Sequence, residues 1–302
     1  MKKILFQLIV VAIFASCSKN IQEDVISEID TIYYTTTDGG IAEVYNDDFG
    51  AELVSNTYEN GVGIIKCDGN IDKIGFRAFY SCRNLKSISI PDSVVEIGDY
   101  AFADCCSLEN ATVGNNVGVI GYHAFNTCES LTEIIIPNSV KTIGYFAFEY
   151  CRSLARVVFG NGVESIGGSA FAFCTGLKDV VIPNNVTEID YYAFFGCSNL
   201  QSIIIPDSIT AINAFVFSEC SSLTTITIPE SVTEICHWAF YKCSSLICIY
   251  CKNPVPPKLG VSVFDEIISV AKIYVPKSSV DAYKSANNWD GYADRIVGFD
   301  FN

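Results

Sequence analysis

Cysteine is the residue type in this chain with the most chemistry open to it. Fourteen of the 302 residues are cysteine, and thiols can form disulfides, bind metal ions or act as nucleophiles. Eight of them recur every 23 residues in the pattern Phe-x-x-Cys-x-x-Leu, from Cys82 to Cys243. A thiol that returns once per repeat in an apolar pattern replaces an aliphatic side chain. We therefore interpret this cysteine column as buried packing rather than as a reactive site.

Disulfides and zinc are the two alternatives for the cysteines. Neighbouring strands lie about 4.8 Å apart, so distance alone permits bonds between successive cysteines, but parallel side-chain directions disfavour them. Cys248 and Cys251 form a C-x-x-C pair, yet alternation along a strand points them to opposite faces and no second pair follows. We expect reduced thiols and no metal site, and leave open the redox state of Cys106, Cys236 and Cys248.

Histidine offers no catalytic arrangement. His123 and His237 are the only two histidines, and about five repeats, or roughly 24 Å at the strand spacing, separate them. They cannot share a metal ion or a proton. The sequence also carries no phosphate-binding loop or metalloprotease motif. We predict that the chain is not an enzyme and needs no cofactor.

The 23-residue period predicts the architecture. A fixed period without insertions means stacked units that bury their apolar faces against one another. In one unit, Leu85, Ile88 and Ile90 alternate with polar residues, which predicts a short strand. The apolar residues that follow recur at spacings near four and predict a short helical turn: Ile97, Ala101, Phe102, Cys105 and Leu108. We expect an α/β solenoid, with a parallel sheet on one face and helical turns on the other.

The flanks of the repeat predict caps. The expected segments are a signal at 1–17, a tether at 18–31, an N-terminal cap at 32–61, the solenoid at 62–251 and a C-terminal cap at 252–302. Ile32 to Thr35 should add a strand. One repeat before the first full copy, the core positions fall on Val62, Ile65, Cys67 and Ile71. A short helix through Tyr283, with Trp289, should cover the C-terminal end, because an open end would invite polymerisation.

The first seventeen residues differ from the rest in composition. Lys2 and Lys3 precede an apolar stretch that ends in Ala15-Ser16-Cys17. This resembles a bacterial lipoprotein signal, which implies cleavage before Cys17 and lipid on its thiol, at the outer membrane or cell surface. An ordinary secretory signal is the alternative. The apolar stretch, about twelve residues, is too short to cross ~30 Å of hydrocarbon, so membrane contact would be through the lipid alone.

Small polar residues close the predicted strands. Ser or Asn occupies a column that only Gly162 interrupts: Ser93, Asn116, Ser139, Asn185, Ser208 and Ser231. Such side chains face inward and bond backbone groups that the turn leaves unpaired. Together with the recurrent Ala-Phe and the Pro after most strands, this pattern resembles the BspA-like leucine-rich repeats of bacterial surface proteins. The resemblance implies an exported, anchored binding protein, active in adhesion to host matrix proteins or other bacteria.

The period also identifies a candidate binding surface on the strands. The outward residue between the two core positions of each strand is apolar in four successive repeats: Ile135, Val158, Val181 and Ile204. Charged residues run beside them, among them Glu133, Arg156 and Asp179. An apolar stripe rimmed by charge is typical of a protein-binding site. The competing interpretation is that stacked β-branched residues simply stabilise the sheet.

Aromatic residues at the predicted helical turns form a second candidate surface. They are Tyr100, Tyr122, Tyr145, Phe146, Tyr191, Tyr192, Phe215 and Trp238. Most are expected to pack between repeats, while others, with Tyr192 and Trp238 as the candidates, could stack on a glycan. A purely structural spacer fits the sequence as well. The net charge of −15 argues against nucleic acid, whose binding needs clustered Lys and Arg.

Overall fold

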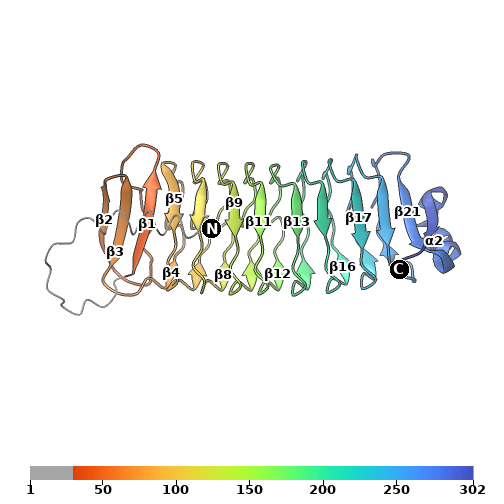
Figure 1. Ribbon diagram of the computed structural model, residues 1–302, viewed down its shortest axis with the longest axis horizontal. Coiled ribbons are helices and arrows are strands. Elements are labelled where there is room, and N and C mark those ends of the chain that lie inside the picture. Colours follow the sequence, from red (N-terminus) through yellow and green to blue (C-terminus); the bar gives the residue numbers. More distant parts are fainter. Residues whose placement is uncertain (1–29, 302) are drawn as a thin grey trace.

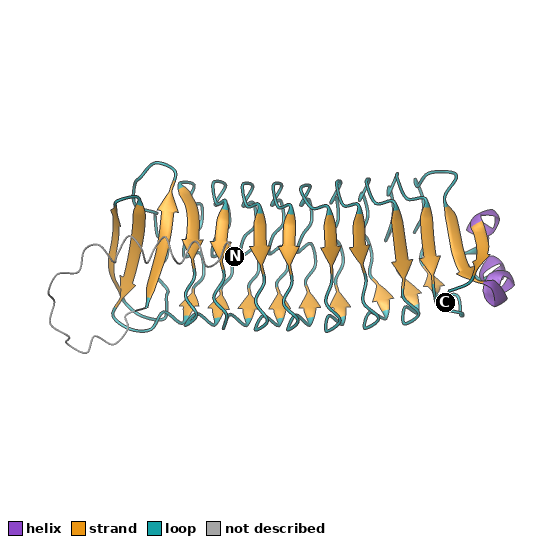
Figure 2. Ribbon diagram, viewed as in Figure 1, coloured by secondary structure: helices purple, strands orange, loops and turns teal. Residues whose placement is uncertain are grey.

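Residues 30–301 are described by the structure, a computed structural model. They form one elongated stack of coils, with the chain advancing along the long axis from the N-terminal to the C-terminal cap (Figure 1). Each coil has three sides: a strand of three to five residues in most coils, a second strand of two residues, and a series of turns. Within residues 30–301 the strands dominate, and the helices of this part of the chain lie at its C-terminal end (Figure 2).

The longer strands make the first side, called here the strand face. They are β5 (Leu85–Ser89), β7 (Asn110–Thr112), β9 (Glu133–Ile135), β11 (Arg156–Val158), β13 (Asp179–Val181), β15 (Ser202–Ile204), β17 (Thr225–Ile228), β19 (Cys248–Cys251), β21 (Lys272–Pro276) and β22 (Ile296–Phe299). The strands that pair are parallel, and each residue lies opposite the equivalent residue of the neighbouring repeat, as Val157 lies opposite Ile134. The predicted strand and its parallel pairing are confirmed.

Two-residue strands make the second side. They are β4 (Lys73–Ile74), β6 (Glu96–Ile97), β8 (Val119–Ile120), β10 (Thr142–Ile143), β12 (Ser165–Ile166), β14 (Glu188–Ile189), β16 (Ala211–Ile212), β18 (Glu234–Ile235) and β20 (Lys258–Leu259). In each of them the second residue is buried. The sequence analysis did not predict this second parallel sheet, because two residues are too few to show an alternation.

The helical turns predicted for the repeat were wrong. The third side is a run of turns in which two residues per coil have positive φ, as at Tyr100 (57°) and Asp104 (61°). Left-handed residues interrupt a helix. Their N–H groups point along the stack instead: the N–H of Tyr100 donates to the carbonyl of Tyr122 at 2.8 Å, and that of Asp104 to Asn126 at 2.9 Å. The amides that a helix would use internally therefore join one coil to the next.

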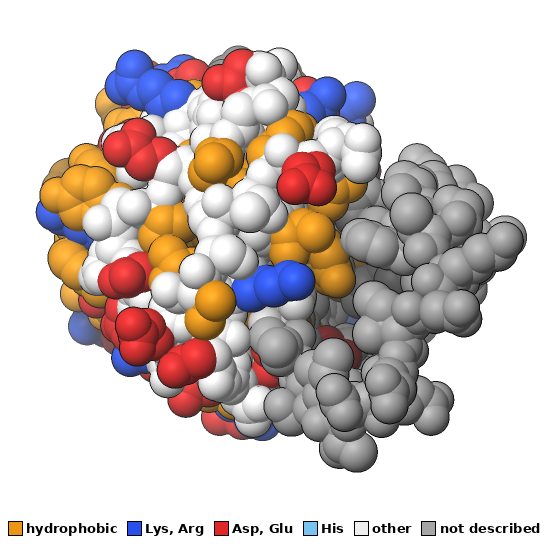
Figure 3. Space-filling view, turned by 90° about the vertical axis from the view of Figure 1, so that its left-hand side faces the viewer, with side chains coloured by type: hydrophobic (Ala, Val, Ile, Leu, Met, Phe, Trp, Pro, Cys, Tyr) orange, Lys and Arg blue, Asp and Glu red, His pale blue; other side chains and the backbone are white. Residues whose placement is uncertain are grey.

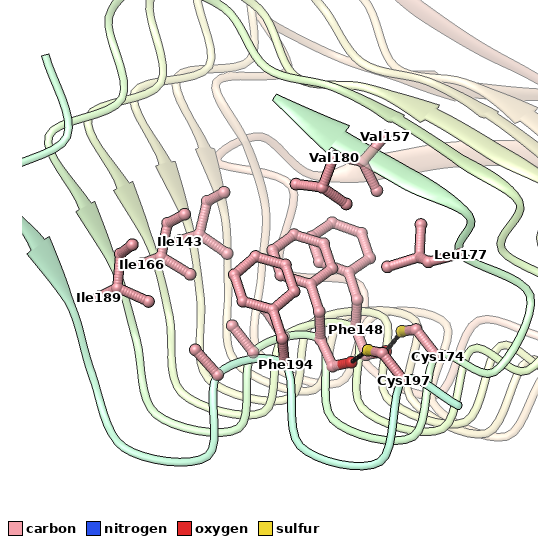
Figure 4. Packing of buried hydrophobic residues seen from close by; sticks show 14 of the residues in the cluster. Ile143, Phe148, Val157, Ile166, Cys174, Leu177, Val180, Ile189, Phe194 and Cys197 are labelled. Atoms are coloured by element: carbon pink, nitrogen blue, oxygen red, sulfur yellow. Dashed lines mark hydrogen bonds between the residues drawn. The ribbon is translucent and has the colours of Figure 1, made fainter. Parts of the chain in front are cut away.

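A ladder of phenylalanine rings fills the core. The eight repeat phenylalanines, Phe79 to Phe240, are fully buried or nearly so. Consecutive rings stack with centroids 4.9–5.9 Å apart, and Phe264 continues the ladder at 5.6 Å. Figure 4 shows the stacked rings between Ile143, Ile166 and Ile189 of the second sheet and Val157 and Val180 of the strand face.

The cysteine column is buried, as predicted, but it also makes hydrogen bonds. The thiol of Cys174 donates to the carbonyl of Phe148 at 3.0 Å, and that of Cys197 to Phe171 at 3.2 Å. The same step of 26 residues recurs for the other cysteines from Cys105 to Cys243. Cys174 and Cys197 lie at the foot of the phenylalanine stack (Figure 4). The thirteen described cysteines are free thiols in this structure.

The column of small polar residues ties coils together at the turn after the strand. The hydroxyl of Ser139 donates to the carbonyl of Val117 at 2.6 Å, and that of Ser231 to Ile209 at 2.7 Å. Asn116 donates to the carbonyl of Asp92 at 2.8 Å, although its side chain is exposed rather than inward. Gly162 is the exception for a steric reason: a Cβ on it would lie 1.8 Å from the carbonyl oxygen of Asn138.

The N-terminal cap is an antiparallel sheet built on the first parallel strand. β1 (Thr31–Thr36) contains the predicted strand residues and pairs with both β5 and β3 (Val62–Cys67), while β2 (Leu53–Glu59) forms the outer edge. Ile65, Cys67 and Ile71 are buried and Val62 is half-buried. Their strand, however, does not stack on the next coil, because β1 lies between. From this end hydrophobic side chains lie in small groups among charged ones (Figure 3).

The C-terminal cap adds β21, β22 and the helices of the stack. The helices are η1 (Lys277–Ser279), α2 (Val280–Ser285) and η2 (Asp290–Arg295). Tyr283 and Trp289 are fully buried. The Tyr283 hydroxyl donates to the carbonyl of Asn253 at 2.7 Å, and the Trp289 indole N–H to that of Pro257, also at 2.7 Å. Both rings therefore bury their apolar bodies while their polar atoms stay paired.

Replacing Gly162 should destabilise the stack. In Gly162→Ala the new Cβ meets the Asn138 carbonyl oxygen, so the backbone of one coil must move, at an expected cost of about 1–3 kcal/mol in the free energy of unfolding. Urea denaturation followed by circular dichroism measures it. Gly118→Ala is the matched control, because a Cβ there has only an ordinary contact at 3.7 Å. Equal midpoints for the two variants would contradict the steric explanation.

Stability should fall steeply in alkali because of the buried thiols. Burial raises the pKa of Cys197 and Cys243 from 9.0 to about 12. Above pH 9 the unfolded chain releases thiol protons that the folded chain retains. The stabilisation is therefore complete below pH 9 and is lost as the pH rises towards 12, by ~1.4 kcal/mol per pH unit for each thiol.

Urea denaturation at pH 8, 9 and 10 measures this loss. The variant Cys174→Ala with Cys197→Ala should be less stable than the native chain at pH 8. Its free energy of unfolding should fall less steeply with pH, because two of the buried thiols that cause the fall are missing. Parallel declines in the two proteins would show that other groups cause the alkaline loss.

Candidate functional site

The apolar stripe predicted on the strands lies on the strand face. Ile135, Val181 and Ile204 are exposed, at 41%, 62% and 59% of their surface, whereas Val158 is half-buried. Val158 stands opposite Ile135 in the β9–β11 pair, and Val181 opposite Ile204 in the β13–β15 pair. The four side chains therefore lie in successive coils. The stripe is least covered at its C-terminal end.

The hydrogen-bonded sheet is interrupted beneath this stripe. β11 ends a sheet of seven strands that begins in the N-terminal cap, and β13 and β15 form a separate two-stranded sheet. Val181 and Ile204 belong to that small sheet. The two most exposed apolar residues of the stripe therefore sit together on one short paired unit.

The charged residues beside the stripe pair along the stack. Arg156 forms an ion pair with Glu133 of the preceding coil, with both side chains largely exposed. The Ser202 hydroxyl donates to Asp179 at 2.6 Å. Exposed pairs of this kind contribute little to stability. They do place a polar edge beside the apolar row.

Some of the aromatic residues at the turns form a second ring ladder outside the phenylalanine core, in two runs separated by Ser169, whereas Tyr122, Tyr145 and Tyr191 lie one residue before that column. Tyr192 stacks on Phe215 at 4.5 Å, and Phe215 on Trp238 at 4.9 Å. Nearer the N-terminus His123 stacks between Tyr100 and Phe146, at 4.8 and 4.7 Å. The ladder occupies the first of the two positive-φ columns. Tyr192 and Trp238 each use one ring face on Phe215, which reduces the surface they could offer to a glycan.

The two histidines have structural partners. Burial of His123 lowers its pKa, which favours the neutral form of the ring that stacks in the ladder. Nδ1 of His237 accepts the N–H of Val261 at 3.2 Å. Within residues 30–301 the structure contains no group of three or more His, Cys, Asp or Glu side chains arranged to hold a metal ion.

A hollow on the turn side was not predicted from the sequence. It has a volume of about 450 Å³ and lies over five consecutive coils, with Phe173, Gly196, Glu219, Lys242 and Glu266 in its lining. These residues belong to the second positive-φ column, so the side chains of the four that are not glycine leave the backbone in the same direction. The signal for it was Gly196, which stands where neighbouring repeats carry a larger side chain.

The proposed anchor lies outside the described residues. Cys17 and the apolar stretch before it belong to the part of the chain that the structure does not describe. Within the described range, 30–301, the helices are all too short or too polar to span a bilayer.

Comparison with known proteins agrees with this geometry. A family model, described as the BspA type leucine rich repeat region with six copies, matches residues 57–178 and 164–288. A leucine-rich repeat protein from Bacteroides ovatus has 28% identity and a TM-score of 0.56, over 84% of this chain and 71% of its own. The leucine-rich repeat protein of T. pallidum has 29% identity and a TM-score of 0.55, over 68% and 91%.

No match was found among curated proteins. The leucine-rich repeat fold is typical of protein-binding or structural roles. The family model covers most of the stack, and its repeat is the one that the Ala-Phe-x-x-Cys pattern predicted. This chain therefore belongs to the BspA-type leucine-rich repeat family.

Proposed function

We propose that this chain is an exported, lipid-anchored protein that binds a protein partner through its strand face. The observation that carries the proposal is the exposure of Val181 and Ile204 side by side on paired strands. Exposed apolar side chains gathered in one place, with a polar rim, are typical of interaction surfaces. The partner would be a host matrix protein or a protein of another bacterial surface, as the family resemblance implies.

The stripe is well suited to rigid recognition. Backbone hydrogen bonds and the phenylalanine ladder hold each strand, so the face would lose little conformational freedom on binding. Ile135 and Val158 extend the apolar row towards the N-terminal cap, and the Arg156–Glu133 pair borders it. Charges at the rim of an interface contribute mainly to specificity and association rate.

The lipid on Cys17 would place the stack at the cell surface or outer membrane. Residues 18–31 would then separate the membrane from the first coil. With two or more acyl chains such an anchor is stable, whereas a single chain holds only marginally. A spacer without a ligand is the competing role, and it predicts no effect of strand-face substitutions on binding.

Charging the stripe should abolish partner binding without unfolding the chain. In Val181→Lys with Ile204→Lys, two exposed side chains gain ammonium groups that an apolar contact cannot accommodate, so we expect binding to an array of host matrix proteins to fall at least tenfold. The free energy of unfolding should change by less than about 0.5 kcal/mol per substitution, because both sites are exposed.

The matched control is Val95→Lys with Val119→Lys. These valines are exposed at 53% and 42% and lie at the second sheet, away from the strand face. The control should retain full array binding. Equal binding by the strand-face variant and the native chain would reject the strand face as the binding surface.

A further inference from the structure

The hollow on the turn side lies where a third stack of side chains stops. Tyr150 and Phe173 stack at 4.8 Å with planes only 2° apart. One coil further on, the same position is Gly196, with φ of 67°. A Cβ there would lie 2.8 Å from Cδ1 of Phe173. The parallel stack therefore ends at Phe173, which Phe195 contacts edge-on with ring centroids 5.1 Å apart. The ring of Phe173 lines the hollow together with Gly196.

Charged side chains occupy the same column on the far side of the glycine. Glu219 and Lys242 form an ion pair at 3.2 Å between adjacent coils, and Glu266 accepts the Tyr241 hydroxyl at 2.7 Å. Both contacts use Oε1 of the glutamate, and both glutamates line the hollow. The three charged groups sum to one negative charge.

Hydroxyl groups line one flank of the hollow at one-coil intervals. They belong to Ser198, Ser221 and Ser244, which are 23 residues apart. The hydroxyl of Ser221 donates to the carbonyl of Ser198 at 3.2 Å, so its oxygen can still accept a hydrogen bond. The row follows the stack axis with a step of about 4.8 Å.

The aromatic ring, the charged groups and the serine hydroxyls together favour a ligand rich in hydroxyl groups. The volume of about 450 Å³ lies within the range of small-molecule sites, roughly 300–1,000 Å³. An aromatic ring can cover the C–H face of a sugar, while carboxylates accept from its hydroxyls and Lys242 donates to them. The carboxylates oppose an anion, and an apolar ligand would have to desolvate all three charges.

We propose that this hollow is a binding subsite for a neutral saccharide, with the ring on Phe173 and its hydroxyls on Glu219, Lys242 and Glu266. The serine row lets a longer glycan follow the stack axis. The subsite is separate from the strand face, so it does not depend on the proposed protein-binding function. It also differs from the glycan site at Tyr192 and Trp238 considered from the sequence.

A glycan array containing neutral, acidic and amino sugars tests the proposal. The full chain should bind neutral glycans, and Glu219→Gln with Glu266→Gln should lower that signal at least tenfold. The substitutions preserve side-chain shape and are at accessible positions, so the circular dichroism spectrum should not change. Glu164→Gln is the matched control, because Glu164 forms an exposed cross-coil pair with Lys141 away from the hollow; it should bind as the native chain does.

The outcomes separate this subsite from the strand face. The variant Val181→Lys with Ile204→Lys should keep its glycan signal while losing protein binding. No neutral-glycan signal with the native chain, a signal confined to acidic or amino sugars, or a signal that the double glutamine variant retains would each overturn the proposal.

Discussion

Hydrogen bonds between the backbones of successive coils are the constraint on which the structure depends. On the strand face and the second sheet they are parallel ladders, and on the turn side they run from positive-φ residues to carbonyls 22 residues ahead. A buried amide without a partner is costly. Each repeat from Phe79 to Phe240 keeps the same length, so all three sets stay aligned. The one extra residue before Phe264 lies in the turn between Cys251 and Lys258, where both sheets still pair across it. The side-chain columns follow from the constant repeat length.

Much of the fold was predictable because the buried apolar residues recur at fixed spacings in the sequence. The strand at Leu85 and the buried phenylalanines follow from apolar spacing alone. The turn side did not follow, because its spacing near four is the spacing of a helix. Positive φ at residues such as Tyr100 costs energy in isolation, and only the bond to the next coil makes it favourable. That hydrogen bond joins residues 22 positions apart, so the pattern of neighbouring residues in the sequence does not predict it.

The candidate sites also differ in how far the sequence predicts them. The outward column of the strand face could be predicted, because alternation along a strand assigns each residue to one side. The greater burial of Val158 could not be predicted in this way. The thiols of the cysteine column donate hydrogen bonds to carbonyl groups 26 residues away, and that geometry cannot be predicted from the sequence. The hollow at Gly196 required knowing that Phe173, Glu219 and Lys242 leave the backbone in one direction. Without the left-handed column, these residues are only polar and aromatic positions in a turn.

A regular stack by itself cannot specify where a ligand binds. Identical columns present the same surface at every coil, so a ligand would meet equivalent positions about every 4.8 Å. A unique position arises only where a column changes its residue type. The outward column of the strand face is aliphatic from Ile135 to Ile204, and the Tyr150–Phe173 stack ends at Gly196. At Gly196 the backbone bond to the next coil persists, from its N–H to the carbonyl of Ser218 at 2.9 Å, whereas the strand-face exception coincides with a break in pairing between β11 and β13. Binding specificity in this fold therefore resides in departures from the repeat, while its stability resides in the repeat itself.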